Sequence, residues 1–201
     1  MTISGTTTTA AASSSSSSSS GGGSSSNGTT NKTIARAVTI NDTKVTADQN
    51  KNIITIPSIS KNTAALVNIP NPAAGVTKIA FAVKNDVSNV SMTITKLDKT
   101  PAGPALPDKV FSYIQIDKNV ADSDIASATI EFQVDKNWLS ANKIDKSTVT
   151  LNRLSGTWAR LVTKQTGETT THAIYQAESP GLSVFAITGA ELPTTVTTAT
   201  P

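Results

Sequence analysis

The segment "ATIEFQV" at residues 128–134 alternates apolar and polar side chains, with Ile130, Phe132 and Val134 in every second position. A period of two is typical of a strand that buries one face and leaves the other in water. The segment therefore predicts a half-buried antiparallel strand.

The same alternation recurs on both sides of this segment. It is clearest in "KTIARAVTI" (32–40), "KIAFAVK" (78–84) and "NVSMTITK" (89–96). Further candidate strands are "NIITI" (52–56), "ALVNI" (65–69), "VFSYIQI" (110–116), "TVTLNRL" (148–154), "TWARLV" (157–162), "HAIYQAE" (172–178) and "LSVFAI" (182–187). Turn residues separate them, as in "IPNPAAG" (69–75), "TPAGPALPD" (100–108) and "LSGT" (154–157). About ten strands at this spacing predict an all-β fold, an antiparallel, immunoglobulin-like β-sandwich.

One segment departs from the alternation. In "DKNWLSANKID" (135–145), Asp135 is suited to cap a short helix near 136–142, and Asn142 is suited to its left-handed exit. Trp138 and Leu139 are then expected to face inward.

The chain divides into three parts by composition. Residues 1–33 are almost entirely Ser, Thr, Gly and Ala, so they bury too little apolar surface to offset backbone ordering and should form a disordered or extended arm. Residues 34–189 form the predicted sandwich, and 190–201 are a Thr/Pro-rich tail. About 165 residues follow the low-complexity N-terminal segment, and this number is enough to form one hydrophobic core.

Charge and composition exclude several classes of partner. The net charge of +3 comes from scattered lysines, so no nucleic-acid partner is expected. There is no cysteine, and the sequence shows no membrane span of about 18 apolar residues. Stability must therefore come from packing without disulfides.

Little in the sequence favours catalysis. His172 is the single histidine and, with no cysteine, the usual nucleophile–base pair and zinc ligands are missing, so the chain is predicted not to be an enzyme. The densest group of oxygen ligands is Asp117, Asn119, Asp122 and Asp124 in "DKNVADSDIA". It lacks the glycine and terminal glutamate of an EF-hand loop, so we expect a solvated turn, with a calcium site as the alternative and no other cofactor.

Four Asn-x-Ser/Thr triplets predict covalent glycans and hence an exported protein. They begin at Asn27, Asn31, Asn41 and Asn89. Saccharide binding is a further reading, because Trp158, Tyr113 and Tyr175 could offer flat faces to a surface glycan. With only two tryptophans in the chain, Trp138 and Trp158 are expected as core anchors instead.

The order of motifs in residues 128–189 is similar to that of a known domain family. The order "TIEFQV", "NWLSANKI", "VTLNR", "TWARL" and "PGLSVFAI" resembles the archaeal PGF-pre-PGF domain, and "NVSMTITKLDKTPAGPALPDKVFSYIQI" (89–116) is similar to the proline-rich crossover of that family. Together the likeness covers roughly residues 50–189. It implies an exported archaeal protein at the cell surface. That family commonly precedes a C-terminal anchor, whereas a Thr-rich tail follows Gly189 here.

The first strand, together with the arm before it, indicates a structural role. A sandwich has sheet edges that a strand from a neighbouring chain can complete, and "TIARAVTI" has the length and alternation of such a donor, with Ile34, Val38 and Ile40 on one face. The alternative is that it forms the first strand of its own sandwich. We expect a homo-oligomeric, pilus-like extracellular filament joined by donor-strand exchange. The alternatives are a tethered adhesion or carbohydrate-binding module, or an S-layer-associated protein.

Overall fold

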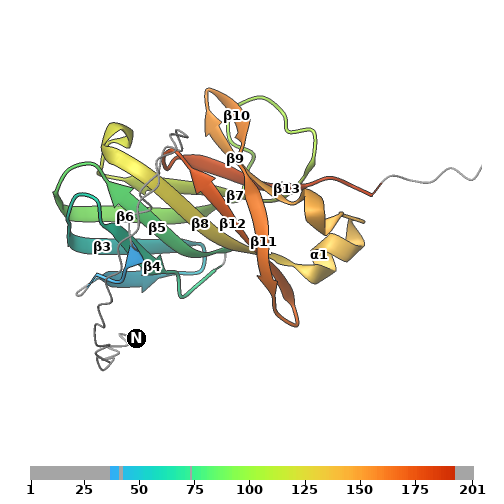
Figure 1. The fold of residues 1–201 in the computed structure, drawn as a ribbon. Helices are drawn as coiled ribbons and strands as arrows, with labels where there is room; N and C mark the ends of the chain where they lie inside the picture. Colours follow the sequence, from blue (N-terminus) through green and yellow to red (C-terminus); the bar gives the residue numbers. More distant parts are fainter. Residues whose placement is uncertain (1–36, 41–42, 73, 193–201) are drawn as a thin grey trace, which may run out of the picture. The chain divides into compact units, whose positions relative to one another are not determined.

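The computed structural model describes residues 37–40, 43–72 and 74–192, which form two β-sheets packed as a sandwich (Figure 1). The six-stranded sheet contains, in spatial order, β1 (Ala37–Val38), β4 (Ala64–Asn68), β5 (Val76–Val83), β8 (Ile125–Asp135), β12 (His172–Ser179) and β11 (Thr163–Glu168). The seven-stranded sheet contains β10 (Thr157–Arg160), β9 (Thr150–Ser155), β13 (Val184–Gly189), β7 (Lys109–Lys118), β6 (Val87–Leu97), β3 (Lys51–Ile59) and β2 (Lys44–Ala47). The predicted β-sandwich is confirmed, whereas the arm at 1–33 and residues 193–201 lie outside the described residues.

Neighbouring strands are antiparallel, with one exception among the described pairs. β1 runs parallel to β4, with Ala37 opposite Ala64 and Val38 opposite Ala65. The chain also passes repeatedly between the sheets, for example from β5 to β6 and from β7 to β8. Neither sheet is therefore built from one continuous stretch of sequence.

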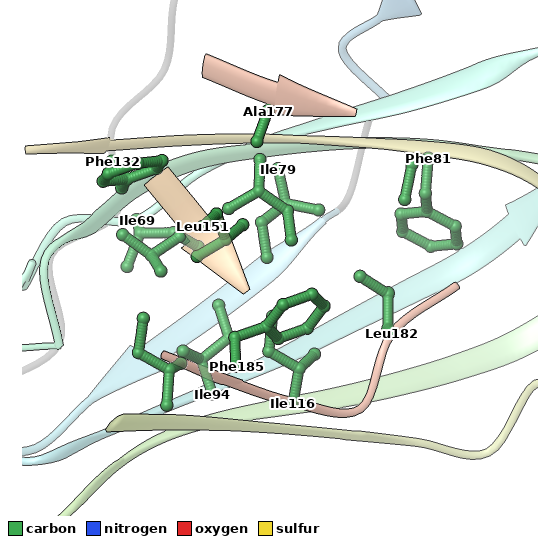
Figure 2. Close-up of a cluster of buried hydrophobic side chains, with 14 of the residues drawn as sticks. Ile69, Ile79, Phe81, Ile94, Ile116, Phe132, Leu151, Ala177, Leu182 and Phe185 are labelled. Atoms are coloured by element: carbon green, nitrogen blue, oxygen red, sulfur yellow. The ribbon is translucent and has the colours of Figure 1, made fainter. Parts of the chain in front are cut away.

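The apolar positions of the predicted strands form the core between the sheets (Figure 2). Buried side chains of the six-stranded sheet include Ile79, Phe81, Ile130, Phe132 and Val134, and those of the seven-stranded sheet include Val90, Met92, Ile94, Ile116 and Phe185. Each of these is at most 2% exposed. Because both inner faces contribute to a single cluster, burial holds the two sheets together without any disulfide.

The predicted short helix is α1 (Lys136–Ala141), and one of its expected features is wrong. Asp135 caps it as predicted, because its side chain accepts a hydrogen bond from the Asn137 backbone N–H at 2.6 Å. Leu139 is buried, and Trp138 is half-buried and packs against the core. The left-handed exit is not at Asn142, whose φ is −97°, but at Lys143, whose φ is +52°. Two single turns, η1 (Asp122–Asp124) and η2 (Lys146–Thr148), complete the helical elements of the described residues.

Two strands at sheet edges lack an apolar alternation and were not predicted. β2 has the sequence KVTA and β11 has TKQTGE, and both are largely exposed. Their backbones pair with β3 and β12, so ladder hydrogen bonds rather than buried side chains define them. Residues 98–108 are not a crossover between sheets: they connect β6 to β7, which are antiparallel neighbours in one sheet.

Candidate functional site

The sheet edges differ in how well they are protected against pairing with another chain. β11 has a register irregularity between Gln165 and Gly167 and carries Lys164 and Glu168. β2 and β10 are each four residues long and contain a lysine and an arginine, respectively. Bulges, charges and short length are the usual devices that stop edge-to-edge association. Three of the described edges therefore resist strand addition.

At the fourth edge the outermost strand, β1, is only two residues long, and the strand beside it, β4, has neither a charge nor a bulge. Its sequence AALVN contains no charged residue, and Ala64, Ala65 and Val67 are buried. β1 covers it at only two positions, so the outer ladder side of Leu66–Asn68 has no paired strand among the described residues. We call this surface the β4 edge. It is the candidate site for strand addition.

The structure describes two of the three predicted donor side chains, and it pairs Val38 with β4 of its own chain. Val38 is 44% exposed, and Ile40 is half-buried and packs against the core. Ile34 lies outside the described residues. Among the described residues this strand comprises Ala37–Val38, and it ends there because the Ile40 carbonyl accepts hydrogen bonds from Thr43 and the chain turns away.

Of the four predicted glycosylation positions, Asn89 is described and Asn27, Asn31 and Asn41 lie outside the described residues. Asn89 is exposed on β6 with φ of +53°, at the position that faces Pro57 in the β3–β6 register. Its backbone carbonyl accepts a hydrogen bond from Asn119 at 2.8 Å. The side chain therefore projects from an anchored backbone into solvent.

Three of the four residues of the candidate calcium site have separate side-chain partners, and Asp124, in η1, bonds through its backbone to Lys84 and Ala121. Asp117 accepts from the Gln115 amide, and both ends of the Asn119 side-chain amide bond to β6 backbone atoms. Asp122 forms ion pairs with Lys118 at 2.7 Å and Arg153 at 2.9 Å. Within the described part of the chain, no group of three or more His, Asp or Glu residues is arranged to hold a metal ion.

Asp122 instead organises the turn before β13. Burial raises the pKa of its carboxyl, but the hydrogen bond and charge of Lys118, with the charge of Arg153 and the Leu182 backbone N–H, lower it overall. A Cβ at Gly181 would lie 2.9 Å from the Arg153 guanidinium and 3.1 Å from the Asp122 carboxylate. A side chain at Gly181 would therefore require the ends of the Arg153 and Asp122 side chains to shift.

The three aromatic residues of the predicted saccharide platform do not form one surface. Tyr175 is buried, stacks on Phe132 with ring centroids 5.5 Å apart, and donates to the Lys146 carbonyl. Trp158 and Tyr113 are half-buried neighbours at 6.2 Å, but the Trp158 indole N–H donates to the Pro104 carbonyl at 2.8 Å. The prediction that Trp158 is a core anchor is wrong, because Trp158 lies outside the core cluster and its indole N–H instead holds loop 98–108 at Pro104.

Two carboxylates on β8, Glu131 and Asp135, and the single histidine, His172, have structural partners. Glu131 pairs with Lys78 at 3.2 Å and accepts from Thr77, and Asp135 caps α1. His172 is half-buried at the start of β12, and its Nδ1 lies 2.8 Å from the Thr171 hydroxyl.

No protein-family model matches this chain, and no curated protein matches it. In the part of the chain that the structure describes, no helix is long and apolar enough to cross a membrane.

Proposed function

We propose that this protein is a non-enzymatic structural subunit of an archaeal extracellular surface filament, in which residues 34–40 of one copy pair with the β4 edge of the next. The observation that carries this proposal is the contrast between the β4 edge and the three protected edges. The resemblance to exported archaeal surface domains and the sequons supports the location.

The short ladder between β1 and β4 suggests how a donor binds. Each β1 residue lies opposite the residue 27 positions later, Ala37 opposite Ala64 and Val38 opposite Ala65. If this register continues for two more residues, Ile40 comes opposite Val67, whose side chain is 2% exposed and faces the core. Full burial of one such side chain contributes about 1.5 to 3 kcal/mol.

A neighbouring copy is the occupant that this geometry favours. Within one chain, the turn at Ile40–Thr43 ends the pairing after Val38 because the chain must reach β2 in the other sheet. A strand supplied by a second copy does not have to turn at the same point. Repeated head-to-tail contacts that do not close into a ring produce a filament.

The absence of native cysteine permits a direct test. Two single-cysteine proteins, Val38→Cys and Ala65→Cys, are mixed and oxidised. Strand exchange brings the two positions together from different chains, within the spacing a disulfide requires, and yields a linked heterodimer. The products are separated on a non-reducing gel, with Val162→Cys replacing Val38→Cys as the control because Val162 is exposed and lies before a protected edge.

A second experiment distinguishes pairing of the first strand with another copy from pairing with its own chain. The double variant Val38→Cys/Ala65→Cys should form interchain ladders if strands exchange. Monomers closed by an internal disulfide, together with no heterodimer in the mixture, would overturn the proposal and leave a tethered surface module.

A further inference from the structure

A pocket of about 320 Å³ lies where β8 ends and α1 begins. Its walls come from both sheets and from α1, with Phe111 on β7, Gln133 and Asp135 on β8, Asn137 and Trp138 on α1 and His172 on β12. This volume is at the lower end of the range of about 300 to 1,000 Å³ found for ligand sites. None of its residues belongs to the β4 edge.

One wall of the pocket is aromatic. Phe111 and Trp138 meet edge to face, with ring centroids 5.1 Å apart and an interplanar angle of 67°. Both rings pack against the core on one side and are only partly buried. They therefore combine a fixed position with accessible ring surface, which is favourable for a ligand that presents C–H groups to an aromatic ring.

The pocket lining also carries polar groups with unused hydrogen-bonding capacity. The side-chain amides of Gln133 and Asn137 form no hydrogen bond with any described residue. Asp135 uses one carboxylate oxygen for the Asn137 backbone N–H, and His172 uses Nδ1 with Thr171. The second carboxylate oxygen and the imidazole Nε2 have no partner among the described residues. Asp135 and His172 are directly opposed in the β8–β12 register.

We propose that this pocket binds a neutral saccharide ring. Each amide offers both a donor and an acceptor, which matches hydroxyl groups that also donate and accept. The aromatic wall suits the apolar face of a sugar ring. A single carboxylate, already engaged as a helix cap, favours a polyhydroxylated ligand over a cation, and the absence of Lys or Arg from the lining argues against an anion.

The test uses the full chain labelled with ¹⁵N. Glucose, galactose, mannose and N-acetylglucosamine are titrated separately, and tetramethylammonium and acetate serve as charged probes of similar size. We expect at least one sugar to shift the Trp138 indole resonance and the backbone amides of Gln133 and Asn137 in a saturable way, and the charged probes to leave them unchanged.

Matched variants separate binding from general perturbation. Gln133→Ala removes one proposed hydrogen bond and should weaken sugar affinity roughly 3- to 10-fold. Gln176→Ala is the control, because Gln176 is exposed on β12 of the same sheet and does not line the pocket. Each variant is first checked for an unchanged spectrum in the absence of sugar.

Three outcomes would overturn the inference. They are the absence of any saturable shift with the four sugars, equal affinity in Gln133→Ala and the unaltered protein, and a response to a charged probe alone. Because no pocket residue lies at the β4 edge, failure here leaves the strand-exchange experiment unaffected, and the reverse also holds.

Discussion

Glu168 shows how an exposed carboxylate can fix the end of an edge strand. It lies at the end of β11 and accepts from Lys136 at 2.6 Å, Lys146 at 3.0 Å and Gln165 at 2.7 Å. The hydrogen bond from Lys136, followed by those from Lys146 and Gln165, lowers the pKa of Glu168 from 4.5 to about 2. The carboxylate thus connects β11 to α1 and to η2.

This depressed pKa has a definite consequence for acid stability. Because the folded state holds the ionised form, its stabilising contribution is complete above about pH 4.5 and is lost as the pH falls towards 2. Side-chain ¹³C NMR should show Glu168 titrating near pH 2. In Glu168→Gln, urea midpoints should fall less between pH 5 and pH 2.5 than in the unaltered protein. An unchanged pH dependence would contradict this role.

At the scale of elements, side-chain contacts from β9 and β10 hold the long loop 98–108, which connects β6 to β7. Trp158 donates to the Pro104 carbonyl, Arg160 pairs with Asp108 at 3.5 Å, and a Cβ at Gly103 would lie 3.3 Å from Leu154. These contacts press a proline-rich segment onto the face of β9 and β10 that points away from the core. Packing of this kind protects a long loop that has no strand or helix of its own.

Trp158→Phe tests how this loop is held. The variant retains an aromatic ring but loses the indole N–H, so one hydrogen bond worth about 0.5 to 1.5 kcal/mol disappears. We expect faster proteolysis and faster hydrogen exchange within residues 98–108. Trp138→Phe, on α1, should leave this segment as well protected as before. Equal protection of the loop in both variants would show that the Pro104 contact is dispensable.

The sequence predicted the interior strands well and the edges poorly, for a physical reason. Over residues 90–94 of β6 and 128–134 of β8 every second side chain is buried, so the period of two is visible in the sequence. β2 and β11 bury almost nothing and exist because a neighbour supplies hydrogen bonds, which leave no trace in local composition. The sequence also did not predict where β1 ends, because its end depends on pairing with β4 and on the turn at Ile40–Thr43.

The candidate sites show the same division. Asp135 was recognised as a cap because capping is local in sequence. The pocket was missed because its residues come from β7, β8, α1, β12 and the connection between β4 and β5, which only the fold brings together. The β4 edge was missed because "ALVNI" has the same alternation as an interior strand, and only the sheet order places it beside a two-residue partner.

At the scale of the whole molecule, the outward face of the seven-stranded sheet is compatible with glycosylation. Asn89 projects from β6, whereas the β4 edge belongs to the six-stranded sheet. A glycan there would not cover the proposed strand-exchange site. Asn89 and the β4 edge thus belong to different sheets of the sandwich.

Peptide mapping of protein from its native source should find a glycan on the peptide containing Asn89. Asn62 provides the control, because it is also exposed and has a positive φ of +61° but does not begin an Asn-x-Ser/Thr triplet. The glycan should be absent when Ser91→Ala removes the acceptor triplet. An unmodified Asn89 peptide would contradict the expectation of glycosylation at this position.

In the proposed filament, the β4 edge would also determine the two ends of the assembly. If each copy gives one strand and receives one, a growing chain has an empty β4 edge at one end and an unused strand at the other. The fibre is then polar, and addition at its two ends involves different chemical events. A copy that lacked residues 34–40 but kept its β4 edge could join only the end that presents an unused strand, and it would stop growth there.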